Sequence, residues 1–149
     1  MRKIAIVGCR PPELTLDLHL PERLVLYGRI LADVREFCES FDDRDVDHMS
    51  DVVLVSGGAE GVDRYAEEWF GDAIIHRPDY ARHGARAPLV RNRLIVRDAD
   101  VVHAWPAPWS RGTRHTIRLA RECGKPCIVH ELPQLNVDGS GAAAGPVLP

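Results

Sequence analysis

Five short runs of nearly continuous Val, Ile, Leu and Ala recur along the chain. They occupy positions 3–8, 52–56, 73–76, 100–105 and 126–130. Strands covered on both faces form continuous apolar runs, whereas strands with one exposed face alternate between apolar and polar residues. The five runs therefore predict parallel strands that are buried on both sides.

Hydrophobic residues between these runs recur at helical spacing. In the first interval, steps of three and four place six residues on one helix face: Leu24, Tyr27, Leu31, Val34, Cys38 and Phe41. Three more helices are expected at 60–70, from near Pro88, and from Gly112 or Thr113 to Gly124. Right-handed crossovers turn this alternation into an α/β fold, a three-layer Rossmann-like sandwich with a central parallel sheet of about five strands.

Two segments lie outside the alternation. Residues 39–51 carry six acidic residues and one Arg, which predicts a solvated loop. Residues 133–149 contain three Gly, three Pro and a single charged residue. We therefore expect one domain over residues 1–132 and a flexible C-terminal tail over residues 133–149.

The composition is that of an ordinary globular domain. Of the 149 residues, 45% are hydrophobic and 28% are charged. The apolar runs are much too short to cross a bilayer, and the amino terminus lacks a signal-peptide pattern. Four scattered cysteines and seven histidines lack the spacing of a metal site. We expect a cytoplasmic protein with neither a metal nor a cofactor.

The charge is unevenly distributed along the chain. The net charge is −3, and 17 of the 19 basic residues are Arg. The mild acidity of the whole chain disfavours an extended nucleic-acid surface. Between Arg77 and Arg97, however, six arginines stand against Asp79 alone. Because guanidinium groups bind phosphate and carboxylate through two hydrogen bonds, this segment favours a focused pocket for a small anion.

Three turns that follow predicted strands have the chemistry of an anion site. They span 8–10, 56–63 and 110–113, and each combines glycine with Arg or Ser. Glycine lets the backbone approach a ligand, and the unpaired amides at a helix start attract anions. In an open parallel sheet such turns meet beyond the carboxyl ends of the strands. Phosphate is the expected guest, although the turns match neither a Walker A loop nor the dinucleotide-binding fingerprint.

Twelve residues from these turns and their surroundings form the candidate ligand-binding set. In this interpretation the glycines shape the walls, the last turn holds phosphate, two arginines add charge, and Asp63 or Asn92 contacts sugar hydroxyls. For Asp63, the alternative is a structural carboxylate that caps backbone amides at the start of its helix. The set comprises Gly8, Arg10, Gly57, Gly58, Gly61, Asp63, Arg91, Asn92, Trp105, Ser110, Gly112 and Thr113.

Two tryptophans flank the prolines that precede the last turn. Trp105 ends the fourth predicted strand, and Trp109 directly precedes Ser110. An aromatic face beside a phosphate-binding turn can stack on a base. The alternative is packing in the core or at a dimer interface. We assign Trp105 to the candidate site.

The motifs are recognisable as an ordered set. They are Gly-Cys-Arg at 8–10, Gly-Gly-Ala-Glu-Gly-Val-Asp at 57–63, His-Gly-Ala-Arg-Ala at 83–87, Arg-Asn at 91–92, Trp-Pro at 105–106 and Ser-Arg-Gly-Thr at 110–113. This set resembles the pattern of the SLOG superfamily and, within it, the YspA-like group. The resemblance implies a Rossmann-like domain that binds nucleotides or nucleotide-derived molecules across the strand ends, often as a homodimer.

The resemblance also extends to the LOG phosphoribohydrolases, which cleave the bond between a base and ribose 5′-monophosphate. These enzymes have a Glu where this chain has Thr116. Because a threonine cannot supply the carboxylate that this reaction uses, the replacement candidates are Glu60, Asp63 and Asp79, and we assign the catalytic role to Asp63 and Glu60. The sequence leaves open whether the chain is an enzyme.

The expected function is binding of a phosphorylated nucleoside or nucleotide-derived small ligand at the C-terminal edge of the sheet. The alternative is an N-glycosidic bond hydrolase or transferase that acts on nucleoside monophosphates. The expected partners are the small ligand and a second copy of the chain. Neither a membrane nor an extended nucleic-acid surface is expected.

Overall fold

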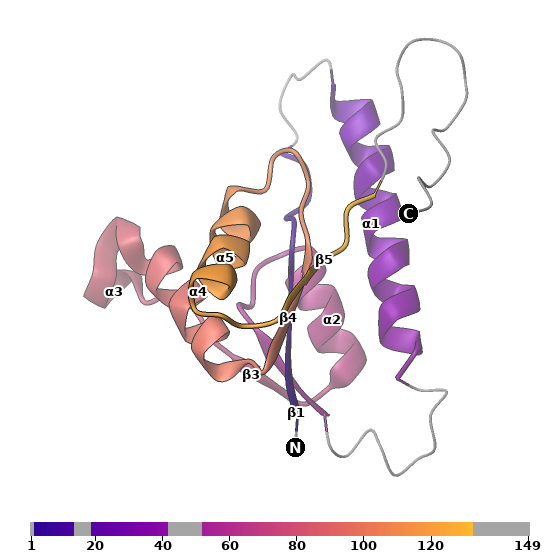
Figure 1. Cartoon of the computed structure of the whole chain (residues 1–149). Helices are drawn as coiled ribbons and strands as arrows, with labels where there is room; N and C mark the ends of the chain where they lie inside the picture. The colour runs from indigo at the N-terminus through magenta and orange to yellow at the C-terminus, as the bar shows by residue number, and fades with distance from the viewer. Residues whose placement is uncertain (1, 14–18, 42–51, 133–149) are drawn as a thin grey trace.

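Five parallel strands form one sheet in the order β3-β2-β1-β4-β5 (Figure 1). The computed structural model describes residues 2–13, 19–41 and 52–132. The strands are β1 (Arg2–Gly8), β2 (Val52–Ser56), β3 (Ala73–Ile75), β4 (Val101–Trp105) and β5 (Cys127–Val129). The five strands expected from the apolar runs are therefore confirmed, with ends that differ by at most one residue.

Helices cover both faces of the sheet, so the predicted three-layer Rossmann-like architecture is confirmed. Figure 1 shows α1 and α2 on one side of the strands and α4 and α5 on the other. The helical segments are α1 (Leu20–Glu39), α2 (Val62–Phe70), α3 (Tyr80–His83), the 3₁₀ helix η2 (Gly84–Arg86), α4 (Ala87–Asp98) and α5 (Arg111–Glu122). In the described part of the chain, no helix is long and apolar enough to span a bilayer.

The core has two halves because alternate side chains of a strand point to opposite faces of the sheet. In β1, Ile4 and Ile6 join the cluster under α1 and α2, whereas Ala5 and Val7 join the cluster under α4 and α5. All four side chains are buried. This double burial explains why the strands form continuous apolar runs in the sequence.

One helical region was not predicted. Before α4, which starts close to the expected Pro88, the chain forms α3 and η2. The side chain of Asp79 accepts a hydrogen bond from the backbone N–H of Arg82 at 3.0 Å and so caps the first turn of α3. Residues 42–51 of the expected acidic loop and the expected tail at 133–149 lie outside the described residues.

The strand order determines where a ligand can bind. The chain moves outward from β1 to β2 and β3, returns across the sheet, and then continues through β4 and β5 on the other side of β1. The loops that follow β1 and β4 therefore diverge at the carboxyl edge of the sheet. Such a reversal point is where open α/β sheets bind ligands.

Candidate functional site

A cleft of about 970 Å³ opens at this reversal point. The end of β1, the start of α2, one side of α4 and the loop between β4 and α5 contribute its walls. It collects nine residues that the sequence had singled out: Gly8, Arg10, Glu60, Asp63, Arg91, Asn92, Ser110, Gly112 and Thr113. Turns that are far apart in the chain therefore meet at one site, as the three glycine-containing turns predict.

Three of the predicted glycines, at positions 57, 58 and 61, affect the shape of the cleft indirectly. A Cβ atom at Gly57 would lie 2.8 Å from Nη1 of Arg91 and 2.9 Å from Oδ2 of Asp63, so only glycine lets both side chains pack there. Gly58 and Gly61 have φ values of +67° and +99°, which favour glycine. These residues do not line the cleft, and they shape it through the backbone.

Trp105 is also absent from the cleft, which corrects its assignment as a ligand-stacking residue. Its side chain is completely buried, and its indole N–H donates to Asp33 Oδ2 at 2.8 Å. The ring stacks on His130 with 4.1 Å between centroids. Because both faces of β4 are covered, the last strand residue points into the core, as the alternative interpretation held.

Arg91 is the central cation of the cleft. Its Nη1 donates to the carbonyl of Gly57 at 2.6 Å, and its Nε donates to Oδ1 of Asn92 at 3.0 Å. Burial lowers the pKa of Arg91, while the neighbouring Asp63 carboxylate acts in the opposite direction. These bonds fix the guanidinium and link α4 to the turn that follows β2.

Asp63 is buried at the first turn of α2. Its Oδ1 accepts a hydrogen bond from the backbone N–H of Gly8 at 3.3 Å. Burial raises the pKa of Asp63 to about 6, while Arg91 and the backbone amides of Gly8 and Ala59 act to lower it. The carboxylate therefore connects α2 to the end of β1 through a hydrogen bond with the backbone amide of Gly8.

Asn92 connects α4 with the start of α5. Its Nδ2 donates to Nδ1 of His115 at 3.0 Å and lies 3.4 Å from the carbonyl of Gly112. Because an amide nitrogen only donates, Nδ1 of His115 is the acceptor here. Thr116, at the position of the LOG glutamate, is buried and donates its hydroxyl to the same Gly112 carbonyl at 3.1 Å.

Trp109 takes the place that was assigned to Trp105. It lines the cleft, and its indole N–H donates to the carbonyl of Arg10 at 2.9 Å. The guanidinium of Arg23 lies 5.8 Å from the Trp109 ring centroid. Arg23 and Arg111 also line the cleft and were not predicted. In the sequence, Arg23 lies in the first turn of the helix that contains Pro21, and Arg111 directly follows Ser110.

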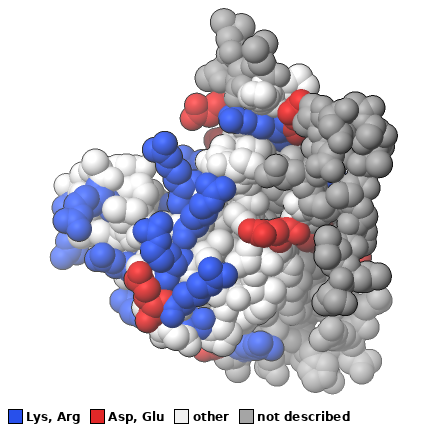
Figure 2. All heavy atoms as spheres, turned by 45° about the horizontal axis from the view of Figure 1, so that its top comes forward, with Lys and Arg blue, Asp and Glu red and all other residues white. Residues whose placement is uncertain are grey.

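The helices on one side of the cleft carry a strongly basic face. Figure 2 shows Lys and Arg side chains gathered on the side of the molecule formed by α3, α4 and α5, with few acidic side chains between them. These helices and η2 hold two acidic residues and nine arginines. Eight of the nine are exposed: Arg82, Arg86, Arg93, Arg97, Arg111, Arg114, Arg118 and Arg121. Among the described residues, no group of His, Cys, Asp and Glu could hold a metal ion.

The fold and the cleft define an α/β protein of Rossmann-like architecture with a basic site at the strand ends. No protein-family model matches the chain. It is 40% identical over 87 residues to the gene 61 protein of Mycobacterium phage D29, a match that covers 52% of this chain and 70% of the phage protein. The chain belongs to the family of that phage gene 61 protein.

A solved structure with the same fold is DNA processing protein A from Helicobacter pylori. It superposes with a TM-score of 0.56 and 24% sequence identity, over 86% of this chain and 64% of that protein. The chain therefore spans slightly less than two thirds of the protein that it matches. That protein binds single-stranded DNA.

This comparison overturns two expectations. The small nucleotide-derived ligand and the N-glycosidic hydrolase or transferase are contradicted, because the protein that shares the fold binds a polynucleotide. The absence of an extended nucleic-acid surface is contradicted for the same reason. The net charge of −3 was misleading because it averages over a surface on which positive charge is concentrated on one face (Figure 2).

Proposed function

We propose that this chain binds single-stranded DNA in the cleft at the carboxyl edge of its sheet, with residues 1–132 as the binding domain. The observation that carries the proposal is the meeting of Arg10, Arg91, Arg111 and the Trp109 indole in one cleft. Single-strand binding sites combine cationic grooves for the backbone with aromatic rings for the bases. The shared fold with a single-stranded DNA-binding protein supports the same function.

The phosphate groups would contact the rim of the cleft. Arg10 and Arg111 are exposed there, and neither side chain is fixed by a carboxylate among the described residues. The backbone amides of Gly112 and Thr113 lie in the first turn of α5, where the helix dipole favours an anion. Charge-assisted bonds to phosphate from these groups supply affinity without reading sequence.

The bases would contact Trp109 and the apolar wall opposite. The cleft is also lined by Pro88 and by the half-exposed Leu89 of α4. An unpaired base can insert its flat face into such a site, whereas the bases of a duplex are already stacked on one another. This geometry favours single strands and tolerates every base.

The buried polar residues position these groups. Arg91, Asp63 and Asn92 bond to the backbone of three different turns, at Gly57, Gly8 and Gly112. They hold the rim arginines and the ring of Trp109 around one opening. We assign these three side chains to positioning, and Arg10, Arg111, Gly112, Thr113 and Trp109 to direct contact.

The motif order supports membership of the SLOG superfamily, and the YspA-like group is the finer assignment that we propose within it. The aligned phage protein and the shared fold are both compatible with this assignment. Homodimer formation and a cytoplasmic location stay predictions that none of these observations tests.

Titration of a fluorescent oligothymidylate, followed by anisotropy, tests the proposed function. Trp109→Ala is expected to weaken binding by about 5- to 150-fold, which corresponds to the loss of one stacked base. Trp109→Phe keeps a ring and should retain most of the affinity. Arg10→Ala should reduce the slope of log K against log salt by about 0.7.

The matched control is Arg35→Ala, which removes an exposed arginine of α1 that does not line the cleft. It should bind as the wild type does. Absence of binding by the wild-type chain, or preference for duplex over single strand, would contradict the proposed function.

A further inference from the structure

A second groove of about 670 Å³ lies on the other side of α5, at the β5 edge of the sheet. We propose that it binds the phosphodiester backbone of the same single-stranded DNA after the strand leaves the cleft. This inference rests on the proposed function and extends the DNA-binding site from the cleft to the groove on the other side of α5. The groove is lined by Leu26, 106–108, Arg114, Ile117, Arg118, Arg121, Glu122, Val129, Glu131 and Leu132.

Three arginines of one helix face form the basic side of the groove. Arg114, Arg118 and Arg121 follow one another at steps of four and three, so their Cβ atoms are about 5 to 6 Å apart along one side of α5. All three are exposed. The result is a row of cations that runs along the helix.

These arginines differ in how firmly they are held. Arg114 donates to the carbonyls of Pro108 and Ala107, both at 3.1 Å, which fixes it against the loop between the cleft and the groove. Within the described residues, the guanidinium groups of Arg118 and Arg121 make no hydrogen bond or ion pair. Two unpaired cations beside a groove are available for an anionic partner.

The groove and the cleft lie on two sides of α5 and of the loop before it. Arg111, Gly112 and Thr113 line the cleft, and the next residue, Arg114, lines the groove. In the loop, Trp109 lines the cleft while the adjacent Pro108 lines the groove. A strand whose base stacks on Trp109 would pass over this loop to reach the three arginines.

The chemistry of the walls favours a polyanion with apolar faces. Leu26, Val129 and Leu132 supply apolar surface, while Glu122 and Glu131 are the acidic residues of the groove. Three arginines against two glutamates leave an excess of positive charge. The chain beyond Leu132 has a single charged residue, Asp138, so it offers little to pair with the arginines.

The experiment compares oligothymidylates of about 5 and about 15 nucleotides, which bracket common single-strand site sizes. The double variant Arg118→Ala/Arg121→Ala is expected to bind the longer strand about tenfold more weakly at low salt and to lose about 1.4 from its salt slope. Its affinity for the shorter strand should stay within about twofold of the wild-type value, because the cleft is intact.

The matched control is Arg82→Ala/Arg93→Ala, which removes two exposed arginines of the same face that line neither the cleft nor the groove. It should retain the wild-type preference for the longer strand. Equal affinity of the Arg118→Ala/Arg121→Ala protein and the wild type for the longer strand, or an equal loss in both double variants, overturns the second site. If the wild-type chain binds neither strand, the proposed function fails as well.

Discussion

Gly61 determines how two of the cleft walls meet. Its φ of +99° lies in the region that favours glycine, and a Cβ atom there would collide with the carbonyl oxygen of Cys9. The next residue, Val62, donates its N–H to that same oxygen at 3.2 Å. The start of α2 therefore rests directly on the loop that follows β1, and no side chain fits between them.

The Gly61→Ala substitution should lower the free energy of unfolding by at least about 2 kcal/mol, because it introduces both backbone strain and a collision. Urea denaturation followed by circular dichroism measures the change. Gly28→Ala is the matched control, since Gly28 lies inside α1 with open space around its Cα. It should raise stability by about 0.5 to 1 kcal/mol. Equal effects of the two substitutions would refute this account of Gly61.

Sequence reasoning found the polar residues of the cleft but chose the wrong tryptophan. Asp63, Arg91 and Asn92 occur in motifs whose position after strands or on a helix determines where they lie. The positions of Trp105 and Trp109 depend instead on which face the last residue of β4 points to, and on the path of a proline-rich loop. Neither is encoded by hydrophobic periodicity, so the two rings could not be distinguished.

At the scale of elements, the sequence patterns predicted all five strands and the four long helices. Strands buried on both faces leave a continuous apolar signal, and long amphipathic helices leave a periodic one. The short helices α3 and η2 leave neither, since no residue in them is buried. Their formation depends on the Asp79 cap and on contact with α4, which are local and tertiary features respectively.

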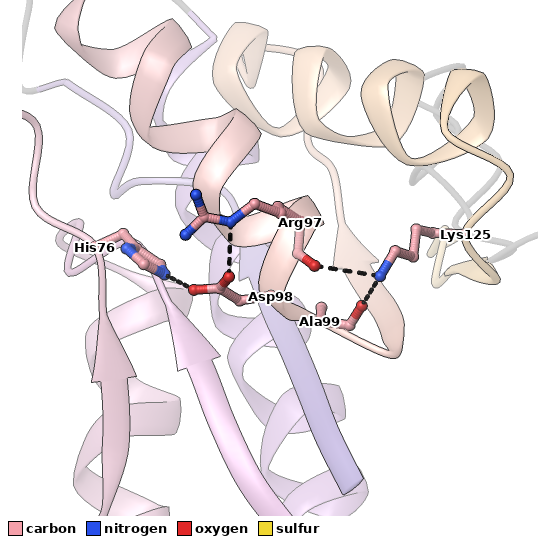
Figure 3. Close-up of polar contacts among 5 residues, drawn as sticks. All are labelled: His76, Arg97, Asp98, Ala99 and Lys125. Carbon is pink, nitrogen blue, oxygen red and sulfur yellow. Dashed lines mark hydrogen bonds and ion pairs between the residues drawn. The ribbon is translucent and has the colours of Figure 1, made fainter.

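The end of α4 shows how elements on one face are joined (Figure 3). Lys125 Nζ donates to the carbonyls of Ala99 at 2.6 Å and of Arg97 at 3.3 Å. Asp98 pairs with Arg97 Nε at 2.9 Å and with His76 Nε2 at 2.7 Å, and its pKa is lowered first by the Arg97 bond and then by His76. A cation at a helix C-terminus is favoured by the helix dipole. Lys125 therefore ties the turn before β5 to α4.

Replacing Lys125 by Met keeps the aliphatic stem and removes the charged donor. We expect the free energy of unfolding to fall by about 1 to 2 kcal/mol, because two carbonyls lose a charge-assisted bond. Chemical denaturation of Lys125→Met and Lys3→Met provides the comparison. The side chain of Lys3, the other lysine of the chain, makes no hydrogen bond within the described residues, so its replacement should change stability by less than about 0.5 kcal/mol. A similar loss of stability in both variants would contradict the proposed role of Lys125 as a cap of α4.

At the scale of the whole molecule, charge is unevenly distributed among the segments of the chain. The helical segments α3, η2, α4 and α5 hold nine arginines and two acidic residues, so the rest of the chain has ten basic and twenty acidic residues. The net charge reports the sum of these regions, whereas a polyanion responds to the local potential. This is why composition alone led to the wrong expectation about nucleic acids.

The separated charge predicts retention on a cation-exchange column at a pH above the isoelectric point of about 6.1. A protein with evenly spread charge would flow through under these conditions, whereas one basic face is enough for binding. The Arg118→Ala/Arg121→Ala protein should elute at lower salt than the wild type. Failure of the wild type to bind the column would contradict a basic face of the kind that Figure 2 shows.

Two of the three tryptophans can serve as separate optical reporters once Trp69 of α2 is replaced by Phe. Trp105 is enclosed in the core, with its ring stacked on His130. Trp109 lies half-buried in the wall of the cleft. Emission from Trp105 therefore follows the integrity of the fold, while emission from Trp109 follows the occupancy of the cleft. Intrinsic fluorescence of the Trp69→Phe protein can thus distinguish a variant that has lost its structure from one in which only the cleft is altered.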